Sequence, residues 1–347
     1  MSEQAQQLYC GIDLHGNNNF IAMLDDQDRT VFKKRVRNDL GAVLDVIEPC
    51  REQVKGVVVE STYNWYWLVD GLMDAGYRVH LANTSAIQQY EGLKYTDDES
   101  DAVWLARMLR LKLLPEGYIF PRGERAVRDL LRKRSALVRQ RTGNILSVEN
   151  LLSRNLGVNV ACAHVKKMKD DEVDRLVGDA NRAMAIKSTL SVMRSLDTQI
   201  AKLEEEVLKQ VASDRRFHQL SLVSGIGDIL GMTIVLETGD IKRFAGVGNY
   251  ASYCRRVKST RISNARRKGT NNRKNGNKHL AWAYGEAAMQ AIRNNPIIKT
   301  YYERKRAKTD APRAMNAVGH KLARAFYHVM RTGKAFDTER AFGNKRS

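Results

Sequence analysis

The sequence has 347 residues, enough for two or three domains, and its formal net charge is +19. No apolar run of about 18 residues is present, which argues against a membrane-spanning helix. The first ten residues lack a basic region followed by an apolar region, so we expect no signal peptide. The four cysteines lie far apart in the sequence (Cys10, Cys50, Cys162 and Cys254). This spacing favours a reduced, cytoplasmic protein without a zinc site.

The charge is unevenly distributed along the chain. Residues 1–120 contain 12 Lys and Arg against 18 Asp and Glu, whereas residues 121–347 contain 46 against 21. An acidic first part joined to a strongly basic remainder suggests a metal-charged catalytic domain beside surfaces that bind nucleic acid.

The first 120 residues alternate between strand and helix patterns. Apolar runs predict strands at 8–13, 20–24, 30–36, 56–60 and 79–82, and helical periodicity predicts helices at 40–50 and 64–75. The order suggests a mixed sheet with helices on its faces, an α/β fold. Asp13 and Glu60 each end an apolar strand, and they could meet if the two strands are neighbours.

An acidic cluster at 97–101 precedes a further helical pattern. Asp98 and Asp101 are three positions apart and share one helix face. One interpretation is that the acids only stabilise the start of the helix, with Thr96 or Asp97 as its N-cap. The other is that they join Asp13 and Glu60 in a four-carboxylate set that holds a hard divalent cation such as Mg²⁺.

Two long amphipathic patterns, at 123–156 and at about 176–211, predict helices that form an antiparallel arm or a contact between subunits. The first is rich in arginine. Arginines on helices usually face solvent, but within so basic a region we expect phosphate contacts, from Arg128, Arg132 and Arg139 among others.

The last third of the chain combines a glycine turn with a basic segment. Gly225 and Gly227 form a Gly-x-Gly turn between apolar helices, which either offers backbone N–H groups to a phosphate or is only a tight turn. Residues 255–278 contain ten Lys or Arg and no acid, and their Asn and Gly content predicts a loop that follows a phosphate backbone. The candidate contacts are Arg255, Arg256, Lys258, Arg261, Arg266, Arg267, Lys268, Arg273, Lys274 and Lys278. Helices are expected at 280–292, 296–308 and 311–330, and the tail from 340 to 347 is expected to be frayed.

Several motifs resemble those of one enzyme family. Gly11-Ile12-Asp13, Val58-Val59-Glu60-Ser61-Thr62 and Asp98-x-x-Asp101-Ala102 resemble the Asp-Glu-Asp-Asp signature of RuvC-like transposases, in particular the IS110 insertion-sequence transposases and the related Piv invertases. The resemblance implies an RNase-H-like domain in which Asp13, Glu60, Asp98 and Asp101 bind Mg²⁺, with Mn²⁺ as a substitute. Neighbouring Asp97 and Glu99 leave an alternative register open.

A second set of motifs, in the same order as in that family, follows in the last third. It comprises Gly225-Ile226-Gly227, Gly239-Asp240-Ile241, Tyr253-Cys254, Ser263-Asn264 and Asn275-Gly276-Asn277-Lys278, and it is most similar to the IS1111 subgroup. The resemblance implies that Ser263 is the DNA nucleophile. On composition alone Ser263 is an ordinary phosphate-contacting serine, and the departures from the family pattern at Arg255 and Asn264 leave Ser259 as an alternative.

The sequence therefore predicts a DNA transposase that cleaves and rejoins DNA through a phosphoserine. We expect a RuvC-like domain at 1–121, a helical, coiled-coil assembly region at 122–213 and a mainly helical transposase domain at 214–347 with a helix-hairpin-helix-like element. The resemblance implies a guide RNA that pairs with donor and target DNA; a homo-oligomer and a nucleoid location in the cytoplasm are further expectations. The alternatives are a metal-only nuclease or Holliday-junction resolvase, in which water attacks, and a non-catalytic nucleic-acid-binding assembly factor.

Overall fold

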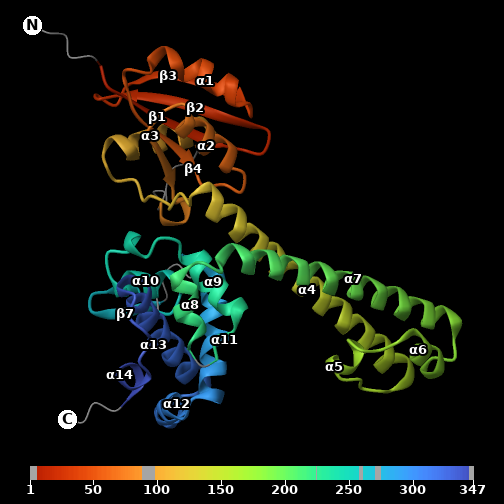
Figure 1. Cartoon of the computed structure of the whole chain (residues 1–347). Coiled ribbons are helices and arrows are strands. Elements are labelled where there is room, and N and C mark those ends of the chain that lie inside the picture. Colours follow the sequence, from red (N-terminus) through yellow and green to blue (C-terminus); the bar gives the residue numbers. More distant parts are fainter. Residues whose placement is uncertain (1–5, 88–97, 224, 258–260, 270–274, 344–347) are drawn as a thin grey trace, which may run out of the picture. The chain divides into compact units, whose positions relative to one another are not determined.

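The computed structural model describes residues 6–87, 98–223, 225–257, 261–269 and 275–343. The chain divides into two compact units, residues 1–119 and 120–347, and each is described by itself (Figure 1). Among the described residues, no helix is both long and apolar enough to cross a membrane. The prediction of an α/β first part followed by a helical remainder is confirmed.

The first unit is a five-stranded mixed sheet with helices against it. Its order is β3-β2-β1-β4-β5. The first three strands form an antiparallel meander, while β4 runs parallel to β1 and β5 parallel to β4. The elements are β1 (Leu8–Leu14), β2 (Asn18–Asp25), β3 (Thr30–Arg37), α1 (Leu40–Ile47), β4 (Val54–Glu60), α2 (Tyr66–Asp74), β5 (Val79–Ala82) and α3 (Asp98–Arg110).

Side chains alternate between the two faces of this sheet, because successive residues of a strand point to opposite sides. Ile12 of β1 and the pair Val57 and Val59 of β4 pack in the core that α1 and α2 complete. Val58 instead packs with Leu105 of α3, on the other face. By the same alternation, Asp13 and Glu60 lie on the α3 face.

Gly11 allows α3 to lie directly on β1. A Cβ atom at this position would overlap the backbone carbonyl of Ala102 in α3 and lie 2.7 Å from the backbone N of Ala106. Any larger residue at position 11 would push the helix away from the strand. The glycine of Gly11-Ile12-Asp13 therefore sets the distance between α3 and the strand end that holds Asp13.

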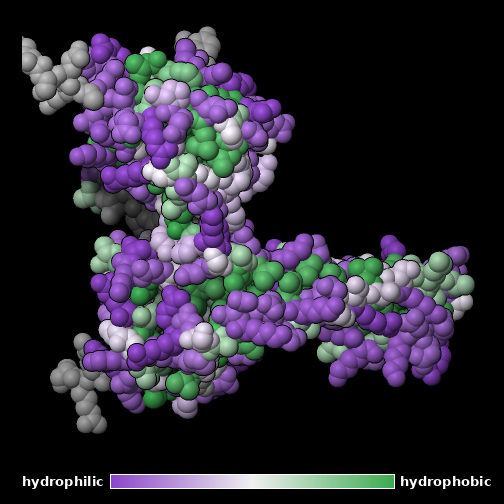
Figure 2. Space-filling view, turned by 45° about the horizontal axis from the view of Figure 1, so that its top comes forward, coloured by the Kyte–Doolittle hydropathy of each residue, from purple (hydrophilic) through white to green (hydrophobic). Residues whose placement is uncertain are grey.

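The second unit begins with two long helices, α4 (Arg122–Leu156) and α7 (Ala180–Val211), which pack along each other as an arm. Two short helices, α5 (Cys162–Val165) and α6 (Asp170–Leu176), connect them. Their joint core includes Ile145, Leu190 and Met193. Figure 2 shows a largely hydrophilic arm surface interrupted by hydrophobic residues.

A helical bundle follows the arm. Its elements are α8 (Arg215–Ser221), α9 (Asp228–Thr238), α10 (Val247–Tyr253), β6 (Arg261–Ser263), β7 (Arg266–Gly269), α11 (Lys278–Asn294), α12 (Pro296–Lys308), α13 (Ala311–Thr332) and α14 (Thr338–Phe342). The core of the bundle is rich in aromatic rings, among them the fully buried Tyr250, Tyr284 and Phe326.

The structure corrects two expectations for this unit. Part of the basic segment is a β-hairpin, β6 paired with β7, and not only a loop. Its two turn residues, Asn264 and Ala265, both have positive φ, 50° and 57°, as the tight turns that suit strand twist require. The expected frayed tail is folded as far as Phe342, because that side chain is 2% exposed and packs on Tyr301.

Candidate active site

Three acids from separate elements of the first unit line one cavity of about 320 Å³. Asp13 comes from the end of β1, Glu60 from the end of β4, and Asp101 from the first turn of α3. Because β1 and β4 are parallel neighbours, their ends lie at the same edge of the sheet. Thr84, Ile87, Trp104 and Leu105 complete the lining.

Burial and the neighbouring carboxylates raise the cost of ionising Glu60 in this cavity. Burial, a hydrogen bond with Asp13 and the charges of Asp13 and Asp101 together raise the pKa of Glu60 to about 8. Asp13 is itself 3% exposed, and its Oδ2 atom accepts no hydrogen bond among the described residues. Ionisation of Glu60 beside Asp13 and Asp101 is therefore unfavourable in this site.

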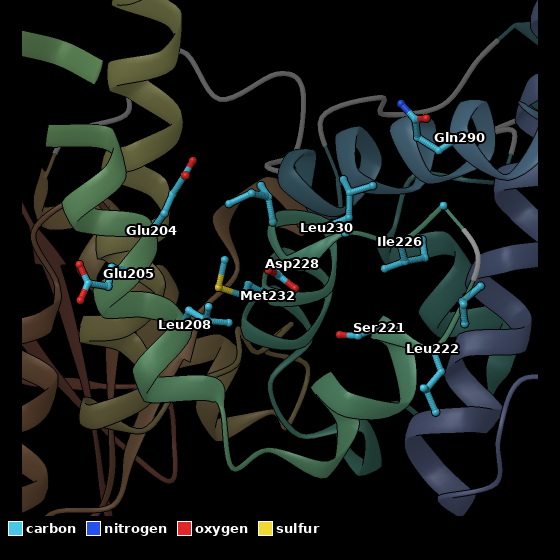
Figure 3. Close-up of a pocket in the computed structure, with 14 residues that line it drawn as sticks. Glu204, Glu205, Leu208, Ser221, Leu222, Ile226, Asp228, Leu230, Met232 and Gln290 are labelled. Carbon is cyan, nitrogen blue, oxygen red and sulfur yellow. The ribbon is translucent and has the colours of Figure 1, made fainter. Parts of the chain in front are cut away.

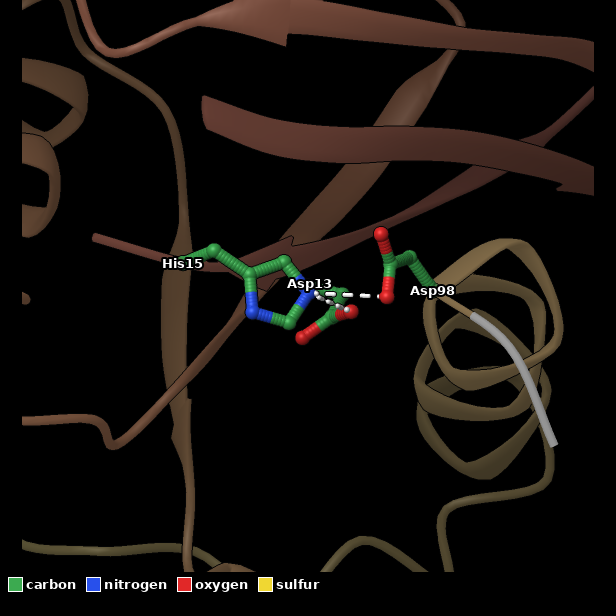
Figure 4. A group of neighbouring side chains, drawn as sticks. All are labelled: Asp13, His15 and Asp98. Atoms are coloured by element: carbon green, nitrogen blue, oxygen red, sulfur yellow. Dashed lines mark ion pairs between the residues drawn. The ribbon is translucent and has the colours of Figure 1, made fainter. Parts of the chain in front are cut away.

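Asp98 lies beside this group and faces a residue that the sequence analysis missed. His15 Nε2 is 3.0 Å from Asp13 Oδ2 and 3.1 Å from Asp98 Oδ1, so that its ring lies between the two carboxylates (Figure 4). The other oxygen of Asp98 accepts a hydrogen bond of 2.8 Å from Arg35 of β3. The available signal was the spacing, since His15 is two residues beyond Asp13 and side chains two apart along an extended chain point to the same side.

The donor set fits a divalent cation. Hard cations prefer carboxylate oxygens, and a buried carboxylate oxygen without a hydrogen bond is an available ligand. Asp13, His15 and Asp98 place one donor atom each within 4.8 Å of one another. When bound, such an ion would polarise a phosphate and neutralise charge that develops on it.

The predicted nucleophile lies in the second unit, on the basic hairpin. Ser263 is the last residue of β6 and pairs with Arg266 across the turn. The base of the hairpin is tied together: the backbone N–H of Asn277 donates to the carbonyl of Tyr253 at 2.6 Å, and Arg255 donates to the carbonyl of Gly276 at 3.0 Å. The backbone of Ser263 is thereby carried on a segment with a fixed base.

The predicted phosphate contacts divide by exposure. The exposed ones are Arg139, Arg266, Lys268 and Lys278. Arg255 is half-buried, and Lys258, Arg273, Lys274 and the side chains of Arg261 and Arg267 lie outside the described part of the chain.

Three of the predicted contacts are used inside the protein instead. Arg128 is 4% exposed with its guanidinium 3.7 Å from the Phe120 ring. Arg132 pairs with the buried Glu237. Arg256 donates to Asn316, and burial lowers the pKa of its guanidinium. For Arg128 and Arg132, amphipathic spacing predicts a helix but does not distinguish a solvent-facing side from one that faces a neighbouring helix. We do not propose Arg128, Arg132 or Arg256 as phosphate contacts.

The Gly-x-Gly turn borders a cavity of about 760 Å³ that three acids help to line, Glu204, Glu205 and Asp228 (Figure 3). Gly225 has φ +91°, and a Cβ there would lie 2.9 Å from the backbone of Gln290 in α11, whereas a Cβ on Gly227 would meet nothing. The first glycine therefore serves packing against α11. The acids disfavour the phosphate contact that the sequence suggested.

Comparison with known proteins finds two transposase family models that match this chain. Residues 10–155 match an Asp-Glu-Asp-Asp (DEDD) transposase model of the IS110 type, and residues 218–303 match the model described as transposase IS116/IS110/IS902 family. The chain is 23% identical over 236 residues to a probable family 20 transposase of Pseudomonas aeruginosa, an alignment that spans 66% of this chain and 68% of that protein. The match to a DEDD-type model indicates use of a divalent metal ion. The chain belongs to the IS110 family of DNA transposases.

Proposed function

We propose that this transposase cleaves and rejoins DNA through a covalent phosphoserine at Ser263, with Asp13, Glu60, Asp98 and Asp101 holding Mg²⁺ or Mn²⁺. The observation that carries the proposal is the convergence of Asp13, Glu60 and Asp101 on one cavity from two strands and a helix. Three buried or half-buried acids would be costly at one place without a cation to bind.

The proposed fold and domain division follow from the same elements. An RNase-H-like first domain at 1–121 is supported by the order β3-β2-β1-β4-β5, with its antiparallel meander and two parallel strands. A coiled-coil assembly region at 122–213 is supported by the packing of α4 along α7. The remainder, 214–347, is the proposed transposase domain.

In the proposed reaction, Ser263 Oγ bonds to phosphorus while the bond from phosphorus to one deoxyribose oxygen breaks. The serine proton passes to a carboxylate of the acidic site, and the released oxygen takes up a proton. The ester conserves the bond energy, so that the attack of a second DNA hydroxyl on phosphorus rejoins the strand and frees the serine. The cations at Arg266 and Lys268 favour the charge that builds up on the attacked phosphate.

We further propose that an RNA of the element guides the enzyme to donor and target DNA, and that it acts as a homo-oligomer. The guide RNA rests on the family resemblance. The oligomer is supported by large apolar side chains exposed on the arm: Leu146 of α4, and Met184 and Val192 of α7, are 52%, 69% and 53% exposed.

The experiment is to incubate the protein, the guide RNA and end-labelled duplex DNA with Mg²⁺, and then to denature the mixture. A band that survives denaturation and disappears with protease is a covalent protein–DNA adduct. We expect it with the wild type and not with Ser263→Ala, and we expect Asp101→Asn to abolish it as well.

The alternatives predict other patterns. If Ser263→Ala still forms the adduct, another residue is the nucleophile, and Ser259 is the first to test. If the wild type cuts DNA without ever forming the adduct, water is the nucleophile and the enzyme is a metal-only nuclease. If it binds DNA and never cuts, the non-catalytic assembly role applies.

A further inference from the structure

The geometry around His15 suggests a ligand role that the Asp-Glu-Asp-Asp pattern does not include. The ring nitrogen Nε2 lies 3.0 Å from Asp13 Oδ2 and 3.1 Å from Asp98 Oδ1, and Figure 4 shows it between the two carboxylates. The His15 side chain is 45% exposed, so burial does not force it into this position. Two carboxylates and one imidazole nitrogen therefore face a common point at the edge of the acidic cavity.

We propose that His15 is a nitrogen ligand of a divalent cation bound between Asp13 and Asp98, beside the position defined by Asp13, Glu60 and Asp101. This inference rests on the proposed metal-dependent function and adds a residue to its site. Asp13 is common to both positions, as a carboxylate shared between two cations would be.

The distances fit a coordination shell. Ligand bonds of about 2.1 Å at right angles place adjacent donor atoms about 3.0 Å apart, and the two separations from His15 Nε2 are 3.0 and 3.1 Å. Asp13 Oδ2 is also the buried oxygen that accepts no hydrogen bond among the described residues. Its closest approach to His15 is thus a contact without hydrogen-bond geometry, which a shared cation would explain.

Strand β3 holds the start of α3 in the position that this site needs. Arg35 binds Oδ2 of Asp98 and leaves Oδ1 directed toward His15. Lys33 forms an ion pair with the neighbouring Glu99. Two cations on one strand thus bind two successive acids of the helix, which fixes the rotation of its first turn about the helix axis.

A nitrogen donor changes which ion the site prefers. Mg²⁺ strongly favours oxygen ligands, whereas first-row transition ions bind imidazole well. The position between Asp13 and Asp98 should therefore bind Mn²⁺ more tightly than Mg²⁺. The position defined by Asp13, Glu60 and Asp101, which has only carboxylate ligands, should differ less in its affinity for the two ions.

The test uses the whole protein and Mn²⁺ alone as the probe, without DNA. Binding is measured from the loss of the free Mn²⁺ signal in electron paramagnetic resonance. Electron spin echo modulation of the bound ion then reports whether a ¹⁴N nucleus is directly coordinated. The variants are His15→Ala and, as the matched control, His164→Ala, because His164 is an exposed histidine of α5 that pairs with Glu172.

We expect ¹⁴N modulation in the wild type and in His164→Ala, and its loss in His15→Ala. We also expect His15→Ala to weaken one class of Mn²⁺ sites by about tenfold or more, with a smaller effect on Mg²⁺ competition. Bound Mn²⁺ without ¹⁴N modulation in the wild type, or modulation that persists in His15→Ala, overturns the role of His15 while the carboxylate site stands. No Mn²⁺ binding at all would instead overturn the proposed metal site.

Discussion

Arg132 and Glu237, 105 positions apart in the chain, form a two-pronged ion pair in which Nε lies 2.6 Å from Oε1 and Nη2 lies 2.7 Å from Oε2. The Glu237 side chain is 2% exposed. Asn277 donates to the same carboxylate at 2.7 Å and also caps the start of α11. The pair therefore joins the arm helix α4 to α9 and to the base of the basic hairpin.

Removing one partner of this pair should be costly. Glu237→Ala leaves the half-buried Arg132 cation without its carboxylate and should lower the free energy of unfolding by about 3 kcal/mol. The measurement is calorimetric unfolding at pH 7. Glu205→Ala is the control, because Glu205 and Lys209 form an exposed ion pair on α7, and its loss should have a much smaller effect.

The stability that Glu237 contributes should vanish in acid. Burial alone would raise the pKa of Glu237, but the hydrogen bond and charge of Arg132, together with the hydrogen bond of Asn277, outweigh it and lower that pKa below the usual value of 4.5. A group with a lowered folded-state pKa stabilises the protein above its unfolded-state pKa and loses that effect as the pH falls through the folded-state value. The difference between wild type and Glu237→Gln should thus shrink below pH 4.5, and an unchanged difference at pH 3 would contradict this account.

The two glycines of the Gly-x-Gly turn should respond differently to substitution. Gly225→Ala introduces a Cβ at positive φ against the backbone of α11 and should cost about 3 kcal/mol. Gly227→Ala meets no neighbouring atom and has φ −82°, so its cost should stay below about 1 kcal/mol. Thermal unfolding of the two variants compares them directly. Equal losses would mean that the turn does not pack on α11 as described.

The strands and the position of an acid at the end of each could be predicted from the sequence because short-range patterns determine them, whereas the meeting of Asp13 and Glu60 was predicted only on the condition that the two strands are neighbours. Successive residues of a strand point to opposite faces, which places Val57 and Val59 on one face and Glu60 on the other, and strands that are parallel neighbours bring their ends to one edge. The helix start at Asp98 follows from its acids and the apolar periodicity after them.

Other features depend on contacts that no local pattern encodes. Arg132 forms its ion pair with Glu237, which lies on another helix. Amphipathic spacing could therefore not distinguish Arg132 from an arginine that faces solvent. The β-hairpin was missed because its Asn, Gly and basic residues are typical of loops, and the backbone conformation of Ala265 is rare for an alanine. His15 was missed because an isolated histidine is usually structural or solvated, and its spacing of two residues from Asp13 is a weak signal by itself.

The turn of the hairpin should tighten on a single substitution. Ala265 has φ 57°, a region that costs a residue with a Cβ about 1–2 kcal/mol and that suits glycine at the second turn position. Ala265→Gly should therefore slow amide hydrogen exchange in β6 and β7 by up to about tenfold. The control is Ala201→Gly on the exposed face of α7, which should instead lower the stability of that helix by about 1 kcal/mol. If amide exchange in α7 also became slower, the effect of glycine would be non-specific.

Asp101 is the acid whose loss should separate cleavage from binding. Asp101→Asn replaces a carboxylate by a neutral amide, a poorer ligand for Mg²⁺, and should reduce strand cleavage by about 100-fold or more while DNA affinity is retained. Asp45→Asn is the matched control, since it makes the same change at an exposed acid of α1, outside the site. Asp97→Asn, outside the described residues, tests the alternative register. Normal cleavage by Asp101→Asn at limiting Mg²⁺ would remove this residue from the site.

The basic hairpin should contribute to DNA binding through charge, and the salt dependence of affinity can measure that contribution. Arg266 and Lys268 are exposed on β7, and with Arg267 they supply three adjacent positive charges. Each phosphate contact releases counterions and adds about 0.9 to the slope of log K against log salt on duplex DNA. Replacing all three by Gln should flatten the slope by up to about 2.7, most clearly at low ionic strength.

The control for the triple variant at 266–268 removes the same number of positive charges from another part of the chain. Lys166, Lys167 and Lys169 are exposed at the connection between α5 and α6, and their replacement by Gln removes three charges at a distance from the hairpin in the sequence. A net charge effect would flatten the slope equally in both triple variants, because long-range attraction depends on the total. If the hairpin contacts phosphate directly, the variant at 266–268 should show the larger decrease in the slope of log K against log salt. Equal decreases in the two triple variants would mean that the side chains at 266–268 face solvent.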